Sequence, residues 1–456
     1  MFIDPALRPA ALVPQLKRFF MLSGKKIWDL ERTWDARRGT PVFTVNGRYT
    51  TRGWTEWTQG FQYGCQILQF EATGDRKFLA LGKKNTLERM AVHVSHVGVH
   101  DHGFNNVSTY GNLRRLMNAG RIPEDAGERA FYEMALKTSG AVQAARWTTL
   151  ADGTGYIHSF NGPHSLFSDT IRSLRTLALS HTLGHVLMGE NDKKHSLLKR
   201  LVEHLENTLK YNVYYGAERD AYDVPGRVAH ESIFNVTDGN YRCPSTQQGY
   251  TPFSTWTRGL AWVLTGCAEQ LEFLPTRAPG EFGGAAAKQR IIKLTERAAH
   301  ATAAFLIEHT CTDGIPMWDT GAPGLAKMPH VYQQPSQPRN PFEPVDSSAA
   351  AIAAQGYLRL GMYFKTKDKT AAQRYTQAGL TMARTLFEEP YLSTDPKHHG
   401  LILHSIYHRP RGWDHQPEPG FAPYGESSLW GDYHAMELAV MVQALAKRKK
   451  VFRFFD

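Results

Sequence analysis

Apolar residues recur along this chain at the spacing of helices that each bury one face. Two runs show this most clearly: Leu198, Leu201, Leu205 and Leu209, and further on Ala371, Tyr375, Ala378, Met382 and Leu386. Residues three or four positions apart lie on the same side of an α-helix. Both runs therefore predict amphipathic helices that pack against a core.

Each of these runs is the second half of a helical hairpin. Three times, an apolar helical pattern is followed by a short turn of Gly, Asp, Asn or Lys and then by a second helical pattern. The turns lie at 74–77, 189–192 and 365–368, and further helices are predicted at 256–273, 288–308 and 434–447. Strand signals are few and short, so the repeated hairpins predict an all-α protein, a toroid or a solenoid of helices.

Two stretches interrupt the helical pattern, at 274–284 and 328–344, and both are rich in Gly and Pro. The pattern resumes on either side of each, which is typical of loops within a domain and not of linkers. We therefore predict a single domain over residues 1–456, in which residues 1–50 form an N-terminal extension with the first helix.

The charge of the chain is positive but dispersed. Its 456 residues include 53 Lys and Arg against 43 Asp and Glu, a formal net charge of +10. A nucleic-acid-binding protein would gather such charge in one tract or on one face. A solvated surface is the simpler explanation, and attraction of an anionic substrate is the alternative. We expect no nucleic-acid partner.

Composition also limits the class of protein and the compartment in which it acts. Hydrophobic residues make up 42% of the chain, which excludes bulk disorder, and no apolar run is long enough for a transmembrane helix. Asp4, Pro5, Arg8 and Pro14 interrupt the region where a secretion signal would be apolar. The four cysteines are scattered, as in a reducing compartment. We expect a cytoplasmic protein with no membrane partner; the sequence does not define its oligomeric state.

Candidate chemistry lies in short segments between the predicted helices. The chain has no phosphate-binding loop, nucleophile elbow or zinc-protease motif. It has segments that combine aromatic rings with single carboxylates, amides or Arg: 55–61, 99–104, 167–171, 247–250 leading into 254–262, 314–319, 344–350, 400–412 and 429–433. Sugars offer apolar faces and hydroxyl edges, so such segments are typical of a saccharide site.

Each of these residues also has a plain structural explanation. Asp169 precedes an apolar helix, where an N-cap is common, and we interpret Asp346 as a cap. Trp256 and Trp262 are of a type more often found in cores than on sugar platforms. His230 alone would be a satisfied histidine.

The ordered set of segments resembles glycoside hydrolase family 88, the unsaturated glucuronyl hydrolases. The shared motifs run from Trp-Thr-x-Gly-Phe at 57–61 through His-Asp-x-Gly-Phe, Ser-Thr-Trp-x-Arg-Gly-x-Ala-Trp and Asp-Ser-Ser-Ala to Trp-Gly-Asp-Tyr at 430–433. They cover most of the chain, and the 254–262 and 430–433 stretches are the most specific. The resemblance implies an (α/α)6 barrel.

The resemblance also implies roles for individual residues. Asp169 would be the catalytic acid/base and Asp101 a second essential carboxylate. The substrate would be bound by polar groups at His230 and Gln248, by aromatic walls at Trp57, Trp256 and Trp262, and by the Arg258 cation. On this interpretation, replacing Arg258 with Ala would mainly raise KM.

The implied reaction removes a 4,5-unsaturated uronic acid from a lyase-generated oligosaccharide by hydrating its enol ether, with neither a metal ion nor an organic cofactor. We expect burial and the charge of Asp101 to raise the pKa of Asp169, so that it holds a proton near neutral pH. Three alternatives stay open: an unsaturated rhamnogalacturonyl hydrolase, a sugar epimerase on the same barrel, and a saccharide-binding protein without catalysis.

Overall fold

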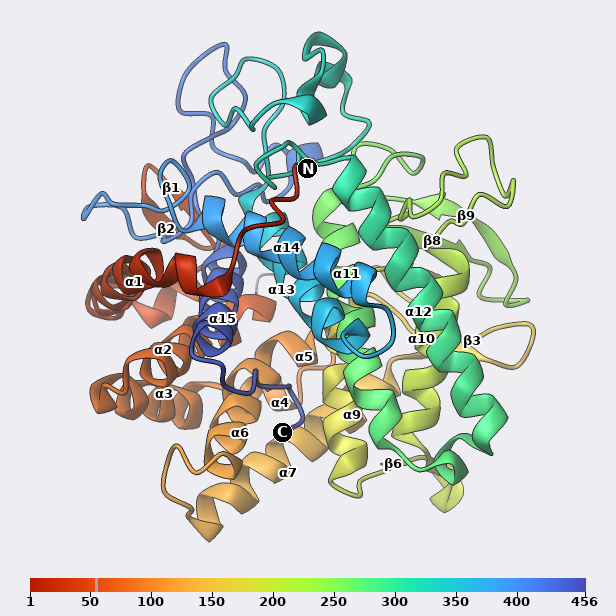
Figure 1. Ribbon diagram of the computed structural model, residues 1–456. Coiled ribbons are helices and arrows are strands. Elements are labelled where there is room, and N and C mark those ends of the chain that lie inside the picture. Colours follow the sequence, from red (N-terminus) through yellow and green to blue (C-terminus); the bar gives the residue numbers. More distant parts are fainter. Residues whose placement is uncertain (54–55) are drawn as a thin grey trace.

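Helices in two rings form most of the molecule, as a computed structural model of residues 1–53 and 56–456 shows (Figure 1). Along the chain, outer and inner helices alternate. The outer helices are α1 (Val13–Thr33), α3 (Arg76–Arg89), α7 (Ala126–Ala145), α10 (Leu197–Tyr211), α12 (Ala285–Glu308) and α14 (Lys369–Leu386). Between α3 and α7, the short α4 (Ala91–Val94) leads into the second inner position.

Six inner positions make the inner ring. Four of these positions are each formed by one α-helix: α2 (Gln59–Thr73), α11 (Thr257–Phe273), α13 (Ser347–Phe364) and α15 (Leu429–Ala446). The second position is interrupted, with α5 (His102–Asn105), a π-helical turn (Val107–Gly111) and α6 (Asn112–Asn118); the third combines α8 (Thr170–Ser173) with α9 (Arg175–Thr182). Each contacts the next, and α15 closes the ring against α2. The all-α prediction and the (α/α)6 barrel are therefore confirmed.

The predicted hairpins at 74–77 and 365–368 correspond to α2–α3 and α13–α14. The predicted turn at 189–192 was wrong as a helix–helix turn, because α9 ends at Thr182 and the turn joins the short strands β6 and β7 that precede α10. Local signals explain the limits of the helices: the side chain of Ser196 accepts the N–H of Lys199 at the start of α10, and Asp368 accepts that of Ala371 at the start of α14. One boundary was wrong. Helix α15 begins at Leu429 and not at His434, because Ser428 caps it by accepting the N–H of Gly431.

The strands are short. Hairpins form between β1 (Phe43–Val45) and β2 (Arg48–Thr50), β3 (Trp147–Thr149) and β4 (Gly155–Ile157), and β6 (Leu187–Met188) and β7 (Lys194–His195). An antiparallel sheet joins β5 (Ser165–Phe167), β8 (Glu231–Phe234) and β9 (Tyr241–Ser245), in that order. Phe167 pairs with Glu231 in this sheet, so the sheet brings Asp169 close to His230.

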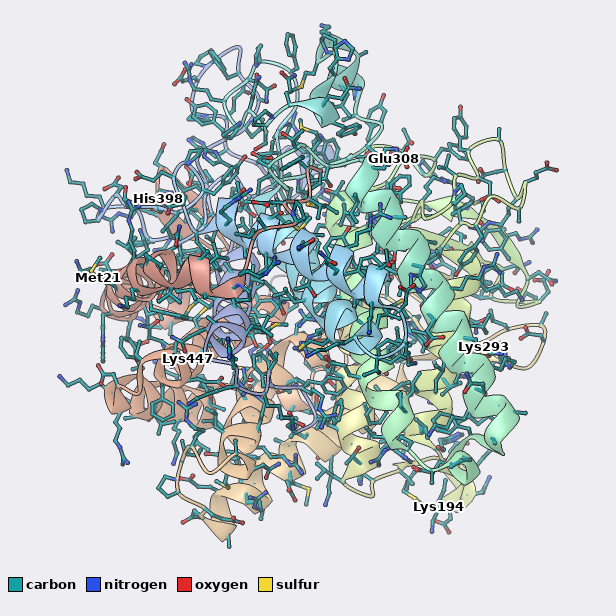
Figure 2. The ribbon with its side chains drawn as sticks, in the orientation of Figure 1. Met21, Lys194, Lys293, Glu308, His398 and Lys447 are labelled. Atoms are coloured by element: carbon teal, nitrogen blue, oxygen red, sulfur yellow. The ribbon has the colours of Figure 1, made fainter. Side chains whose placement is uncertain are left out.

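The outer helices present polar and exposed side chains to solvent, and the space between the rings is apolar. Figure 2 shows Met21 of α1 and Lys293 of α12 extending away from the ring, whereas Leu264, Ile352 and Leu438 of the inner helices are completely buried. Within the described parts of the chain, no helix is long and apolar enough to cross a membrane.

Candidate active site

A cavity of about 630 Å³ opens where the inner helices begin. Its walls include the residues just before or at the starts of α2, α5, α8 and α11: Trp57, Asp101, Asp169 and Trp256. The N-terminal end of a helix carries a partial positive charge, so several such ends surround the cavity. The arrangement suits an anionic ligand.

The two predicted carboxylates lie in this cavity and share an unusual placement. Asp101 and Asp169 occupy the N-cap positions of the short helices α5 and α8, yet neither side chain caps its helix. Both are buried, and Oδ1 of Asp169 has no hydrogen-bond partner. The N-cap explanation of Asp169 therefore fails, because a capping carboxylate would accept a backbone N–H of its own helix. Asp346, in contrast, does cap α13, through the N–H groups of Ser348 and Ala349.

His100 lies between the carboxylates. Its Nε2 is 3.5 Å from Oδ1 of Asp101 and 3.5 Å from Oδ2 of Asp169. Burial opposes a charge on this imidazole, but the two carboxylates together raise its pKa above the ordinary value. The group is therefore a proton-holding cluster and not a simple pair of acids.

The pKa values of the two carboxyl groups diverge. Burial raises the pKa of Asp101 to about 6, and the charge of Asp169 adds to this against the opposing charges of His100 and Arg146. Burial acts in the same direction on Asp169, but the hydrogen bond and charge of His100 hold its pKa below the ordinary value. The expectation of a raised pKa at Asp169 was wrong: of the two carboxyl groups, the one whose pKa is raised is Asp101.

His230 lies behind the cavity wall, beside Asp169. Its Nδ1 accepts the backbone N–H groups of Gln247 and Gln248 at 3.0 and 3.3 Å, so the proton of the neutral ring is on Nε2. That nitrogen is buried without a hydrogen-bond partner, 4.0 Å from Oδ1 of Asp169. Burial lowers the pKa of His230, which keeps the ring a neutral donor directed at the carboxylate.

Aromatic rings form the other walls. Trp57 stacks on Trp430 with ring centroids 5.3 Å apart, and Trp256 packs on His230 at 4.7 Å. Trp262 lies 4.8 Å from Phe104. The predicted tryptophans all line the cavity, although Trp256 and Trp262 are also core residues, only 3% and 2% exposed.

Arg258 lines the cavity, but its environment differs from that expected of a free substrate-binding cation. Nη1 donates to Oδ2 of Asp346 at 3.0 Å and to the carbonyl of Ile406. Nη2 donates to Oε1 of Gln248 at 2.9 Å and to the carbonyl of Tyr407 at 2.7 Å. All four terminal N–H groups are therefore used within the protein. Arg258 therefore connects α11 to Asp346 and to the backbone at 406–407, and it orients Gln248.

Several residues that line the cavity have no role predicted from the sequence: His96, His100, Phe160, Asn161, Tyr407, His408, Arg411 and Trp413. His100 could have been identified from its place beside Asp101, and Tyr407, His408 and Arg411 from the aromatic and basic residues of the segment 400–412. For Phe160 and Asn161 no pattern pointed to the site. They arrive there because Asn161 donates to Oε1 of the buried Glu231 at 3.0 Å.

A metal ion could find ligands only in the same cluster, as far as the described residues show. One ligand atom each from His100, Asp101 and Asp169 lies within 4.8 Å of the other two. The tautomer of His230 argues against a fourth ligand, because its Nδ1 is occupied and its Nε2 carries the proton. The expectation of metal-free chemistry stays a prediction.

Known proteins are similar to this chain in sequence. No protein-family model matches the chain. An unsaturated glucuronyl hydrolase of Formosa agariphila is 25% identical over 386 residues, 84% of this chain and 78% of that protein. An unsaturated chondroitin disaccharide hydrolase of Streptococcus agalactiae is 24% identical over 408 residues, 88% and 84% of the two chains. The match to an unsaturated glucuronyl hydrolase of Bacillus sp. strain GL1 is 28% identical over 214 residues but spans 47% of this chain and only 46% of that protein.

Solved structures share the fold. An unsaturated glucuronyl hydrolase specific for heparin superposes with a TM-score of 0.71 at 20% identity, covering 96% of this chain and 99% of the other. The Streptococcus agalactiae enzyme gives a TM-score of 0.68 at 20% identity, covering 97% and 94%. These matches confirm the resemblance that the ordered motifs indicate. Over most of its length, the chain is therefore similar to the unsaturated glucuronyl hydrolases in sequence and in fold.

Proposed function

We propose that this protein is a glycoside hydrolase that removes a 4,5-unsaturated uronic acid from the non-reducing end of lyase-generated oligosaccharides. The observation that carries the proposal is the cluster of Asp101, His100 and Asp169, buried in an aromatic cavity. Such a cluster can store one proton and deliver it to a bound substrate. The helix starts around the cavity favour the negative charge of a uronate.

The reaction requires one proton for carbon and one molecule of water. Protonation of C4 of the enol ether by the Asp169 carboxyl group creates oxocarbenium character at C5. Water adds to C5 and returns a proton to Asp169; the resulting hemiketal opens, and the hemiacetal at C1 then releases the remaining saccharide. Because Asp169 is ionised without substrate, its proton must come from the cluster. An arriving uronate adds a negative charge, which raises the pKa of nearby carboxyl groups.

The gap between Asp169 and His230 is the proposed position of the water. Oδ1 of Asp169 and Nε2 of His230 are 4.0 Å apart and neither has another partner. A water about 2.8 Å from both atoms would accept from the imidazole and donate to the carboxylate. The ionised Asp169 can then take up its proton as the oxygen attacks C5. His230 is thereby the group that orients the water.

The pKa of Asp101 predicts a pH dependence. In the proposal the proton that Asp169 delivers comes from Asp101, and Asp101 loses its proton as the pH rises through about 6. We therefore expect kcat/KM, which reports the free enzyme, to be high below pH 6 and to fall above it. In the Asp101→Asn variant this alkaline limb should disappear and the overall rate should drop. An unchanged limb in that variant would assign the titration to another group.

Removal of divalent metal is expected to have no effect. Asp169 delivers the proton and His230 orients the water, so the proposed steps use no Lewis acid. Dialysis against EDTA should leave the initial rate on an unsaturated disaccharide within assay error. Loss of activity that Zn²⁺ or Mn²⁺ restores would show that the cluster of His100, Asp101 and Asp169 is a metal site.

The substrate class can be tested with a panel of lyase-generated disaccharides. One curated relative is named a chondroitin disaccharide hydrolase and one solved structure is specific for heparin, so both sulfated and unsulfated members belong in the panel. The proposal predicts loss of the enol-ether absorbance and release of the second sugar. Mass spectrometry detects the released sugar. Sugar interconversion seen by NMR would identify an epimerase. Tight binding without consumption would identify a saccharide-binding protein.

The proposal includes a single catalytic domain over residues 1–456 that acts in the cytoplasm. The contact of α15 with α2 supports the single domain, because the first and last inner helices in the sequence close the same ring. The four cysteines are free thiols, and Cys65, Cys267 and Cys311 are buried. Free thiols are typical of a reducing compartment.

A further inference from the structure

The two helices that carry the carboxylates are in direct backbone contact. The N–H of Gly103 in α5 donates to Oγ of Ser173 in α8 at 2.8 Å. A Cβ atom at position 103 would lie 2.5 Å from the carbonyl oxygen of Ser173, so only glycine fits there. Because α5 and α8 are four residues each, neither can hold its own position. Something outside them must set the separation of Asp101 and Asp169.

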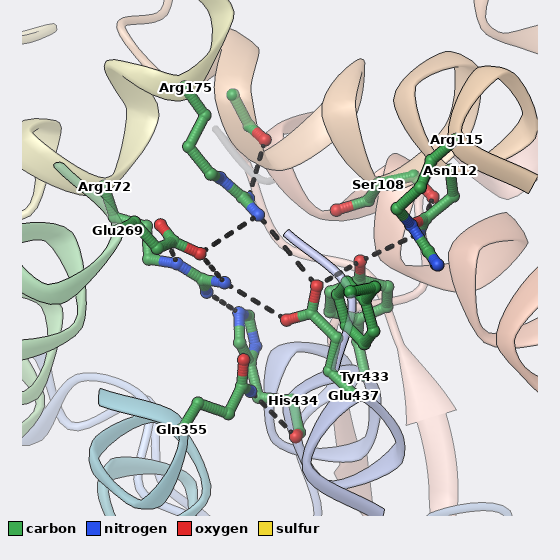
Figure 3. A network of polar contacts seen from close by, with 12 residues as sticks. Ser108, Asn112, Arg115, Arg172, Arg175, Glu269, Gln355, Tyr433, His434 and Glu437 are labelled. Atoms are coloured by element: carbon green, nitrogen blue, oxygen red, sulfur yellow. Dashed lines mark hydrogen bonds and ion pairs between the residues drawn. The ribbon is translucent and has the colours of Figure 1, made fainter. Parts of the chain in front are cut away.

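A buried network of charges lies beneath α8 (Figure 3). Arg172, three residues after Asp169, donates from Nε and Nη2 to the two carboxylate oxygens of Glu269, each at 3.0 Å. Nη2 also donates to Glu437 at 3.1 Å. The side chains of Arg172 and Glu269 are completely buried, and that of Glu437 is 2% exposed. Helix α8 is thus tied to α11 and α15.

The fourth contact of Arg172 fixes the state of His434. Nδ1 of His434 lies 2.6 Å from the carbonyl of Trp430, so that nitrogen carries the ring proton. Nε2 therefore accepts from Nη1 of Arg172 at 2.5 Å. Burial and the charge of Arg172 lower the pKa of His434 far below its ordinary value. The same ring packs on Trp262 at 4.9 Å, which connects the network to the cavity wall.

Arg175 extends the network to the other helix. Its Nη2 donates to the carbonyl of Gly103 at 2.9 Å, within α5. Its Nη1 lies 3.7 Å from Glu269 and 3.9 Å from Glu437. Figure 3 shows Arg172 and Arg175 converging on these two carboxylates. One pair of glutamates therefore holds both arginines of the α8–α9 segment, and Arg175 also reaches across to the backbone of α5.

Stability alone does not explain this network. Removing several charges from water is costly, and well-packed apolar residues of similar volume often stabilise a fold as well or better. A protein can retain such a network because the network imposes a geometry that the function requires. Here the imposed geometry is the placement of two short helices that each begin with a proposed catalytic carboxylate.

We propose that the network of Arg172, Arg175, Glu269 and Glu437 is a positioning device that fixes the separation of Asp101 and Asp169. The inference rests on the proposed hydrolase function. The four residues touch no substrate. Arg172 holds α8 and Arg175 holds α5, both against the same two glutamates, so the carboxylate pair keeps its spacing while substrates bind and leave.

Spacing matters because the properties of the cluster depend on distance. Asp101 faces His100, Asp169 and Arg146, and Asp169 faces His100 and His230, with His204 behind it. A displacement of about 1 Å at a reacting group can cost about a hundredfold in rate. A wider separation would also weaken the effect of each carboxylate on the other and lower the pKa of Asp101.

The test is the Arg172→Lys variant, which keeps the charge but loses the bidentate contact with Glu269. With an unsaturated disaccharide, we expect kcat to fall about a hundredfold and KM to change little, because the cavity walls that bind the sugar are not replaced. We also expect the alkaline limb of kcat/KM to move to lower pH. A merely structural role would not shift that limb.

Arg359→Lys is the matched control. Arg359 is equally buried, on α13, and donates to Glu272 at 2.8 Å, but it approaches Glu269 only to 3.9 Å and touches neither α5 nor α8. We expect this variant to lose stability while its kcat and pH profile stay near wild type. Equal kinetic effects in the two lysine variants, or wild-type kinetics in Arg172→Lys, would overturn the proposal.

If Arg172→Lys fails to fold, Ser173→Ala decides the matter. This variant removes the hydrogen bond that Oγ of Ser173 accepts from the N–H of Gly103 and the one that it donates to Oε1 of Gln143 at 3.3 Å, and it leaves both arginines in place. A several-fold fall in kcat with the same direction of pH shift would support the positioning role, and unchanged kinetics would refute it. Failure of the proposed function itself is distinct, since the wild-type protein would then leave the disaccharide intact.

Discussion

The Asp169→Asn variant is expected to fold like the wild type and to lose turnover by about 10²–10⁴-fold, the usual contribution of a positioned acid or base. Asparagine has nearly the same shape but can neither deliver a proton to C4 nor accept one from water. The fold should survive because the Asp169 side chain does not cap α8 and its Oδ1 has no partner to lose. The measurement is the initial rate of enol-ether absorbance loss, with circular dichroism as a check on folding.

Asp368→Asn is a suitable control for that experiment. Asp368 also stands at a helix N-cap, but there its side chain accepts the N–H of Ala371, and asparagine caps about as well as aspartate. It should retain wild-type rate and stability. If Asp169→Asn also hydrates the substrate at the wild-type rate, Asp169 is not the acid/base.

The Arg258→Ala variant is expected to lose about 3–5 kcal/mol of unfolding free energy. The reason is the environment of its partner: Asp346 is completely buried and would be left as an uncompensated charge. The carbonyls of Ile406 and Tyr407 would lose their donor as well. Urea denaturation followed by tryptophan fluorescence measures this change. The structure thus shifts the expected effect from KM alone to stability first.

Arg384→Ala provides the comparison. Arg384 pairs with Asp4 at 3.2 Å, but the two side chains are 40% and 28% exposed, and such pairs contribute less than about 1 kcal/mol. Arg258→Ala with unchanged stability and a raised KM would contradict our account and restore the interpretation of Arg258 as a free substrate-binding cation.

Much of the fold was predictable because its signals are local. The leucines of α10 and the Ala and Tyr face of α14 carry the helical period in the sequence itself, and turn residues mark where the hairpins reverse. Helix α15 was predicted too short because Trp430, Gly431 and Asp432 look like loop residues. Only the structure shows that Ser428 caps that helix and that all three are buried. The sheet that joins Phe167 to Glu231 depends on pairing between strands too short to give a pattern.

The site was predictable in its residues more than in its chemistry. The motifs placed Asp101, Asp169 and the tryptophans together, and the structure brings them to one cavity. The direction of the pKa shift at Asp169 was not predictable, because it depends on the hydrogen bond and charge of His100, which lies 69 positions away in the sequence. Three partners of Arg258, namely Asp346, Ile406 and Tyr407, are at least 88 positions away in the sequence. No local pattern reports how many N–H groups of a guanidinium are already used.

The central claim is that the glycosidic bond is lost through hydration of the enol ether and not through attack at the anomeric carbon. The most direct measurement follows one lyase-generated unsaturated disaccharide in two ways at once, by its ultraviolet absorbance and by the amount of second sugar released. Our account predicts that absorbance disappears at least as fast as the sugar is released, and that both stop in Asp169→Asn. Release of the sugar with the absorbance intact would contradict it.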